Sequence, residues 1–220
     1  MSFVVTLDGP AGAGKSSVAR RLAKRLSFHH LDTGALYRAV ACCLDQNGIA
    51  PNESEQLVEY LKSMRVHVDE SGVSVNGEDV TALIRSARAD EVVSAYSALK
   101  PVREALLGLQ RAQANHRNLV TDGRDMGSVV FPEADIKFFL TAAPEARAER
   151  RYKELLKKGE TVLYNEILAQ IRERDRTDTG REIAPLKEAG DAIHVDTSFM
   201  SEDEVVNQLT AIVRGRIIKG

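Results

Sequence analysis

The sequence predicts an α/β fold in which helices cover a central parallel sheet of five strands. The apolar strand candidates are continuous rather than alternating in hydropathy, as expected for strands buried on both faces of a parallel sheet. Helical patterns separate these candidates along the chain. With 220 residues, of which 43% are hydrophobic, the chain is long enough to bury such a core without disulfide bonds.

The predicted elements follow one another in order along the chain. The five strand candidates are Phe3–Leu7, Phe28–Leu31, Asn118–Thr121, Asp135–Leu140 and Ala192–Asp196. The first helix, Lys15–Leu26, carries apolar residues every four positions, which gives it one buried face. Another helix begins near Pro101, a common opening residue. The last helix begins with the capping box Ser201-Glu202-Asp203-Glu204.

One stretch departs from this alternation of strand and helix. Residues 66–80 contain short runs in which Val alternates with polar residues, together with the turn signal Asn76-Gly77. This pattern predicts a small antiparallel unit. Helical patterns at Glu53–Met64 and Ala87–Ser97 flank it. We therefore expect residues 52–100 to form a lobe inserted into a core domain of residues 1–51 and 101–220.

A glycine-rich segment directly follows the first predicted strand. It reads Gly9-Pro10-Ala11-Gly12-Ala13-Gly14-Lys15-Ser16 and opens the first helix, which is the context of a phosphate-binding loop. The glycines allow backbone N–H groups to surround an anion at the positive end of the helix. Lys15 is expected to reach the β- and γ-phosphates of a nucleoside triphosphate, and the Ser16 hydroxyl to ligate Mg²⁺. Such a loop alone leaves GTPases, transport ATPases, motor proteins and small kinases open.

Composition and absent motifs narrow these classes. The chain contains neither an Asn-Lys-x-Asp guanine-reading motif nor a Leu-Ser-Gly-Gly-Gln segment, which disfavours GTPases and transport ATPases. The net charge of -2 offers no electrostatic footprint for duplex nucleic acid. No apolar run approaches membrane-spanning length, and the N-terminus lacks the pattern of a signal peptide. We expect a cytoplasmic protein that binds neither nucleic acid nor membrane.

The first polar cluster that could complement the loop follows the second predicted strand. It reads Asp32-Thr33-Gly34-Ala35-Leu36-Tyr37-Arg38. Its Asp and Thr are candidate helix caps. Arg38 is either a solvated helix charge or a ligand of a second phosphate group, since a guanidinium binds phosphate through two hydrogen bonds.

The second cluster, residues 121–127, ends the third predicted strand. Ligands of open α/β sheets bind at the carboxyl ends of strands, which favours a functional role for this segment. Asp122 is a candidate partner of Mg²⁺ through water. Arg124 is a candidate to bind a phosphate, and Asp125 is a candidate to accept hydrogen bonds from an amino group. The structural alternative is an Asp/Gly turn with an internal Arg–Asp pair. Neither His29 nor His30 has metal-ligand spacing, and we interpret both as packing or surface residues.

The third cluster, residues 172–181, is rich in arginine. In a helix, Arg174, Asp178 and Arg181 would share one face. The alternative is a ladder of surface salt bridges. However, Arg placed four residues before Asp is the less favourable order for helix stability. The run also ends in a Thr-Gly-Arg break, which suits a segment that closes over a ligand.

Together with Val-Arg-Glu-Ala-Leu-Leu at residues 102–107, these motifs resemble the bacterial cytidylate kinase family of P-loop nucleoside monophosphate kinases. All five motifs occur in the family's order, and Asp-Gly-Arg-Asp at 122–125 is the most specific. Thr33 stands where the family commonly has Ser, and Ala11 replaces another small residue. The resemblance implies a three-layer P-loop fold, a nucleoside-monophosphate-binding lobe with a small antiparallel sheet, and a short helical lid at about residues 145–181.

The resemblance also implies an activity, the transfer of the γ-phosphoryl group of ATP to CMP or dCMP with Mg²⁺. It further implies that the protein is a monomer. Two alternatives stay open. One is another small kinase on the same core, such as an adenylate, thymidylate or shikimate kinase. The other is a regulatory protein that binds nucleotide and hydrolyses it slowly.

The family's binding residues carry over position by position. Those implied for the ATP phosphates and metal are Gly9, Pro10, Ala11, Gly12, Ala13, Gly14, Lys15, Ser16 and Ser17, with Asp122. Those implied for CMP are Arg38, Arg124 and Arg181 at the phosphate, Ser94, Arg103 and Asp125 at the base, Arg174 and Asp178 near the sugar, and Thr33. Among the lid arginines Arg147, Arg150 and Arg151, we expect Arg150 to contact the transferring phosphoryl group, and Arg147 to be neutralised by Glu145 and Glu149.

Overall fold

The computed structural model describes residues 2–69 and 72–219 of the chain. Contacts divide the described residues into two compact units. The first comprises the residues up to Leu31 together with those from Gln113 onward, and the second comprises Asp32–Ala112. Residues 52–100 lie within the second unit, and the division into a core domain and an inserted lobe with those bounds stays a prediction.

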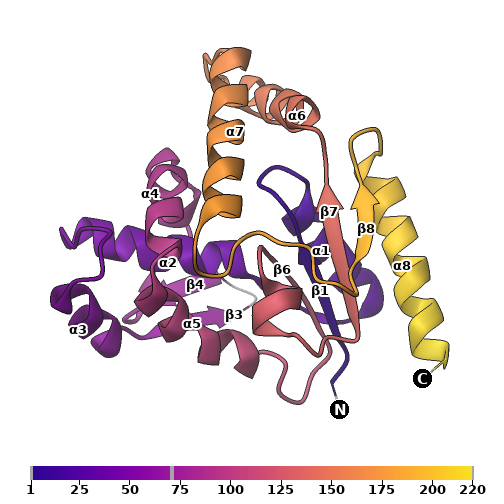
Figure 1. Cartoon of the computed structure of the whole chain (residues 1–220), viewed down its shortest axis with the longest axis horizontal. Coiled ribbons are helices and arrows are strands. Elements are labelled where there is room, and N and C mark those ends of the chain that lie inside the picture. The colour runs from indigo at the N-terminus through magenta and orange to yellow at the C-terminus, as the bar shows by residue number, and fades with distance from the viewer. Residues whose placement is uncertain (1, 70–71, 220) are drawn as a thin grey trace. The chain divides into compact units, whose positions relative to one another are not determined.

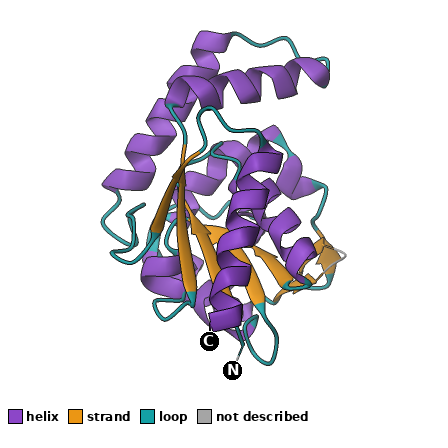
Figure 2. Cartoon of the chain, turned by 90° about the vertical axis from the view of Figure 1, so that its right-hand side faces the viewer, coloured by secondary structure: helices purple, strands orange, loops and turns teal. Residues whose placement is uncertain are grey.

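The first unit is built on a five-stranded sheet of order β2–β6–β1–β7–β8. Its strands are β1 (Val4–Asp8), β2 (His29–Asp32), β6 (Leu119–Gly123), β7 (Ile136–Thr141) and β8 (Ile193–Asp196). Strand β1 pairs in parallel with β6 and β7, and β7 pairs in parallel with β8. Figure 2 shows helices packed against these strands. The predicted parallel α/β core is confirmed, with strand ends within about two residues of those expected.

Two helices, α1 (Lys15–Leu26) and α8 (Glu202–Lys219), pack together in this unit (Figure 1). Val18 and Leu22 of α1 join Val205 and Leu209 of α8 in one buried cluster with the strands. The four-residue spacing of these positions explains the burial, since it gives each helix a single apolar face. The capping box of α8 is confirmed, because the Ser201 backbone N–H donates to the Glu204 carboxylate at 2.8 Å and the Glu204 N–H donates back to Ser201 Oγ at 3.3 Å.

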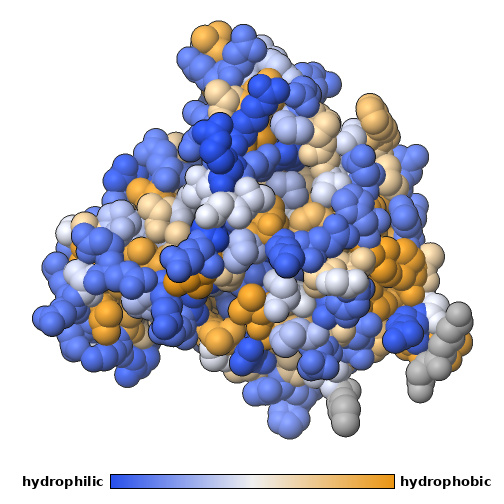
Figure 3. All heavy atoms as spheres, viewed as in Figure 1, coloured by the Kyte–Doolittle hydropathy of each residue, from blue (hydrophilic) through white to orange (hydrophobic). Residues whose placement is uncertain are grey.

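Helices α6 (Pro144–Lys157) and α7 (Tyr164–Gly180) follow β7 and pack against each other (Figure 1). They hold each other through a small apolar cluster that includes Ala148, Leu155 and Ile167. Figure 3 shows mostly hydrophilic side chains over the visible surface of this pair. The residues expected to form a lid are therefore helical, and their closure over a ligand stays a prediction.

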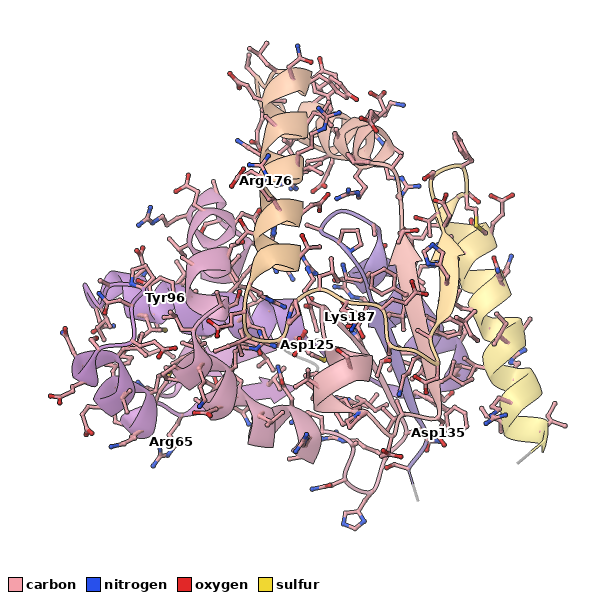
Figure 4. All side chains as sticks on the ribbon, in the orientation of Figure 1. Arg65, Tyr96, Asp125, Asp135, Arg176 and Lys187 are labelled. Carbon is pink, nitrogen blue, oxygen red and sulfur yellow. The ribbon has the colours of Figure 1, made fainter. Side chains whose placement is uncertain are left out.

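The second unit contains the predicted antiparallel sheet, of order β3–β4–β5. Its helices and strands are α2 (Thr33–Gln46), α3 (Glu55–Ser63), β3 (Val66–Asp69), β4 (Gly72–Val75), β5 (Glu78–Asp79), η1 (Leu83–Arg85), α4 (Ala87–Ser97) and α5 (Lys100–Ala112). Helix α2 packs against α4, and the Tyr96 hydroxyl of α4 donates to the Ile49 carbonyl at 2.6 Å (Figure 4). No helix of the described residues is long and apolar enough to cross a membrane.

Candidate active site

The glycine-rich loop between β1 and α1 has a backbone that only glycine can supply at key positions. Gly9 has a φ of 147°, and a Cβ there would lie 1.9 Å from the Leu140 carbonyl oxygen. Gly14, with a φ of 86°, precedes α1 as its N-cap. A left-handed backbone at such positions turns successive N–H groups toward the concave side of the loop. The curvature of the loop therefore depends on the backbone conformations of these glycines.

Lys15 lies inside this loop. Its side chain is only 5% exposed, and its amino group donates to the Pro10 carbonyl at 2.7 Å. Burial, and then the positive charge of Arg124, lower the pKa of the amino group well below its ordinary value. A bound anion would offset both effects, because it favours the charged form of a neighbouring amine. Asp122 and Asp8 act in the opposite direction but do not outweigh burial and Arg124, so the surroundings of Lys15 favour a further anion.

Ser16 and Asp122 meet at the base of the loop. The Ser16 hydroxyl donates to Asp122 Oδ2 at 2.5 Å, and Asp122 is 3% exposed. Because the Ser16 hydroxyl donates its hydrogen bond to the carboxylate, the lone pairs of its oxygen stay available to a cation. Among the residues that the structure describes, no three His, Cys, Asp or Glu side chains gather as a metal site. The pair fits Mg²⁺, which takes one or two protein oxygens and completes its shell with phosphate and water.

His30 also contacts Asp122. Its Nε2 lies 3.0 Å from Asp122 Oδ1. The interpretation of His30 as a packing or surface residue was incomplete, because it misses this pairing with a residue far along the chain. The contact arises because β2 lies beside β6 in the sheet, and strand order is not visible in a local pattern.

Asp8, at the end of β1, is a second residue that sequence reasoning did not single out. Its carboxylate accepts from the Met126 N–H at 2.8 Å and the Gly127 N–H at 2.7 Å, in the short π-helical turn η2 (Met126–Val130). Burial raises the pKa of Asp8 to about 6, although these two hydrogen bonds oppose the shift. Asp8 thus ties the strand before the loop to the segment after Asp122. An Asp placed directly before the glycine-rich loop was the available sequence signal.

The second and third polar clusters meet through Arg124 and Asp178. Arg124 Nε donates to Asp178 Oδ2 at 2.6 Å, so Arg124 has a carboxylate partner in the third cluster. Asp178 is 5% exposed, and Arg181 Nη1 lies 3.9 Å from its other oxygen. Burial acts to raise the pKa of Asp178, but Arg124, Arg174 and Arg181 together outweigh it and lower that pKa. Asp125 is also buried and follows β6 (Figure 4).

Other charges of α7 form the surface ladder that was the alternative interpretation. Arg176, labelled on α7 in Figure 4, pairs with Glu173 on the same helix, and both side chains are exposed. Arg172 pairs with Glu145 at 2.7 Å, also at the surface. The arginine-rich segment therefore has two parts, an exposed ladder and the buried group around Asp178.

Arg147 is bound differently from the prediction. It is 3% exposed and donates through both terminal nitrogens to Asp175 of α7, at 2.9 and 2.5 Å. The predicted neutralisation by Glu145 and Glu149 was therefore incomplete: Arg147 still helps to lower the pKa of Glu145, but the carboxylate that it binds is Asp175. Arg147 Nη1 also donates to the Ala11 carbonyl at 3.0 Å, which links α6 and α7 to the glycine-rich loop.

The other two lid arginines differ from each other. Arg150 donates to the Thr197 carbonyl, and its Nη1 lies 3.3 Å from the Thr197 hydroxyl. That hydroxyl in turn lies 3.3 Å from the Ala13 carbonyl. Arg151 instead pairs at the surface with Glu154. Arg150 is thus linked to the glycine-rich loop through Thr197, whereas the ion pair of Arg151 with Glu154 lies at the surface.

The remaining predicted residues lie in the second unit. Arg38 on α2 donates from Nε and Nη2 to Asp90 Oδ1 of α4, at 3.2 and 3.1 Å. Arg103 on α5 is 8% exposed, lies over the Tyr37 ring at 5.2 Å and donates to the Ser97 carbonyl at 3.0 Å. Thr33 is the buried first residue of α2, where Asp32 is the cap as predicted, and Ser94 lies half-buried within α4.

Comparison with known proteins adds an independent finding. The family model described as Cytidylate kinase matches residues 5–215. The protein named Cytidylate kinase from Geobacter sulfurreducens is 45% identical over 218 residues, which cover 97% of this chain and 94% of the relative. A protein of the same name from Carboxydothermus hydrogenoformans is 47% identical over 213 residues, which cover 95% of this chain and 96% of the relative.

A solved structure shares the fold at much lower identity. It is an uncharacterized protein from Eubacterium ventriosum, with a TM-score of 0.53 and 12% identity over 98% of this chain and 99% of that one.

Proposed function

The chain belongs to the cytidylate kinase family, and we propose that it transfers the γ-phosphoryl group of ATP to CMP or dCMP. The products are ADP and CDP or dCDP. The observation that carries the proposal is the family match along nearly the whole chain, together with a phosphate loop whose Lys15 and Ser16 lie beside a buried carboxylate. An adenylate, thymidylate or shikimate kinase, or a regulatory nucleotide-binding protein, is not favoured by relatives that carry this name at 42–47% identity.

We assign the ATP phosphates to the loop from Gly9 to Ser17. Its backbone curvature and the N-terminus of α1 favour negative charge there. Lys15 is buried, and its lowered pKa would be raised again by a bound anion, so we assign it to the β- and γ-phosphates. Ser16 would hold Mg²⁺ directly and Asp122 through water, and the ion would spread the charge of the transferring phosphoryl group when bound.

We assign the phosphate of CMP to Arg38, Arg124 and Arg181. Arg38 and Arg124 each already bind a carboxylate, Asp90 and Asp178 respectively. This supports anion recognition at both positions, since a guanidinium matches carboxylate and phosphate geometry alike. Thr33 supplies a hydroxyl at the start of α2.

We assign the cytosine base to Arg103, Asp125 and Ser94. Cytosine presents an amino group at N4 and acceptors at N3 and O2. An acceptor such as Asp125 at N4, with Arg103 donating to N3 and O2, distinguishes cytosine from uracil, which has an acceptor at O4 and a donor at N3. A buried mismatch would leave polar groups unpaired, which gives strong discrimination. Arg174 and Asp178 would then lie near the sugar.

The chemistry needs no strong general base. The acceptor is a phosphate oxygen, which is largely deprotonated at neutral pH because its second pKa is about 6. The residues act by holding two anionic groups in line and spreading their charge over Lys and Arg side chains. Arg150 is the lid residue that we assign to the transferring phosphoryl group, with residues 145–181 as the closing lid and residues 52–100 as the lobe that binds CMP.

Several properties of the whole protein complete the proposal. It acts on free nucleotides rather than on nucleic acid, works as a monomer, and is located in the cytoplasm. The net charge of -2 supports the first of these, since a nucleic-acid-binding surface needs a positive excess.

A panel of acceptors tests the function. With labelled ATP and Mg²⁺, we expect CMP and dCMP to give far more ADP than UMP, AMP, GMP or shikimate. Similar turnover with all acceptors would contradict the assigned base recognition. Binding of ATP without transfer to any acceptor would contradict the kinase activity itself.

A further inference from the structure

The carboxylate of Asp122 is bound from two sides. Its Oδ2 accepts from Ser16 of α1 at 2.5 Å, and its Oδ1 lies 3.0 Å from Nε2 of His30 on β2. An ionised carboxylate only accepts hydrogen bonds, so His30 carries its proton on Nε2 and donates it. Each oxygen of Asp122 therefore has its own donor.

The framework around this contact is rigid. His30 and Asp122 lie on β2 and β6, which are neighbours in the sheet. The Thr121 hydroxyl, one residue before Asp122, donates to the Leu31 carbonyl at 3.2 Å in a buried bond between the same two strands. With Asp122 3% exposed and the His30 side chain 16% exposed, little water competes for these oxygens.

The hydrogen bonds from Ser16 and from His30 affect the orientation of the Asp122 carboxylate differently. The bond to Ser16 alone can form with either oxygen, because the terminal torsion of Asp is broad and nearly two-fold. The bond from His30 removes that freedom, since it binds one oxygen and leaves the other toward Ser16. A residue that orients a ligand in this way typically changes metal affinity by about 10–100-fold.

We propose that His30 is a positioning residue that orients the Asp122 carboxylate toward Ser16 and thereby strengthens the binding of ATP together with Mg²⁺. The proposal rests on the proposed function, in which Ser16 and Asp122 hold that ion. His30 itself touches neither the nucleotide nor the metal.

Equilibrium binding tests this without turnover. The dissociation constant of ATP is measured by calorimetry in Mg²⁺ and in EDTA. The constant in EDTA divided by the constant in Mg²⁺ reports how far the metal strengthens binding. The variants are His30→Ala, His30→Gln and His30→Asn. The amide nitrogen of glutamine lies as far along the side chain as Nε2, whereas that of asparagine matches only the nearer Nδ1. Gln and Asn are thus a matched pair of polar side chains, and circular dichroism checks the fold of each variant.

We expect His30→Ala and His30→Asn to reduce this ratio by about tenfold, with ATP affinity in EDTA within twofold of the wild type. His30→Gln should restore most of the ratio. An unchanged ratio in His30→Ala, or an equal loss of affinity with and without Mg²⁺, would overturn the positioning role. If Mg²⁺ fails to strengthen ATP binding by the wild type, the assignment of Ser16 and Asp122 falls, and the role of His30 falls with it.

Discussion

In the glycine-rich loop, backbone geometry orients the groups assigned to ATP, whereas Arg38 and Arg124, assigned to the CMP phosphate, are each held by a carboxylate. Gly9 and Gly14 adopt left-handed conformations, and Lys15 donates to a carbonyl of its own loop. Arg38 instead binds Asp90, and Arg124 binds Asp178. The donor loop is thus ready to accept an anion, while the acceptor arginines must exchange one anion for another. Substitutions should therefore affect the two regions differently.

The largest expected effect is that of Lys15→Ala. Removing the buried cation of the loop should lower kcat with every acceptor by about 10³-fold, because the charge that we assign to the transferring phosphates is lost. Steady-state kinetics with CMP and dCMP measure this. Lys24→Ala, an exposed lysine of the same helix, is the control. A loss confined to one acceptor would mean that Lys15 belongs to the acceptor site instead.

Asp8→Asn tests the region of the glycine-rich loop through the pH dependence of the protein's free energy of unfolding. The folded-state pKa of Asp8 is raised from 3.8 to about 6, so the native state retains a proton that the unfolded state has lost between those values. Relative to the Asn variant, the wild type should therefore lose stability as pH rises from about 4 to 6, by an amount on the order of 3 kcal/mol, and no more above that.

Denaturant unfolding of both proteins between pH 4 and 7 measures this difference. Asp135→Asn is a useful comparison, since that exposed carboxylate also accepts a backbone N–H, from Val4 at 2.7 Å. A constant difference between wild type and Asp8→Asn across the range would show that burial of Asp8 carries no such proton linkage.

On the acceptor side, Arg103→Met should separate base recognition from ATP binding. We expect kcat/KM for CMP to fall by about 10–100-fold, as for loss of a hydrogen bond from a charged donor, while the dissociation constant of ATP stays within twofold. Arg111→Met, at the exposed end of the same helix, controls for changes in α5. Loss of ATP affinity instead would contradict the placement of the base site at Arg103.

The smallest effect is expected for Asp90→Asn. If Arg38 binds the CMP phosphate as proposed, Asp90 competes with that phosphate, and Asp90→Asn should tighten CMP binding by about two- to fivefold, in line with the weak contribution of a partly exposed ion pair. Calorimetry with CMP measures the change, and Glu91→Gln on the same helix is the control. Weaker CMP binding would indicate that Asp90 orients Arg38 for the phosphate rather than competing with it.

Much of this protein could be predicted from local patterns. The five parallel strands, helix α1 over Lys15–Leu26 and the small antiparallel sheet all follow from the spacing of apolar and turn residues. The glycine-rich loop is equally local, because its conformation depends on a few consecutive glycines. These features were visible because each is decided by residues close together in the chain.

The pairings within the candidate site were decided by the tertiary structure. His30 meets Asp122, Asp8 meets Gly127, and Arg147 meets Asp175 only because strand order and helix packing bring distant segments together. Local spacing suggested that Arg147 would pair with the glutamates of its own helix, yet its burial directs it to α7. By itself, the sequence determined which residues could bind phosphate. The fold determined which carboxylate or carbonyl each of them binds, because a buried charge must find its partner among the groups that packing places within reach.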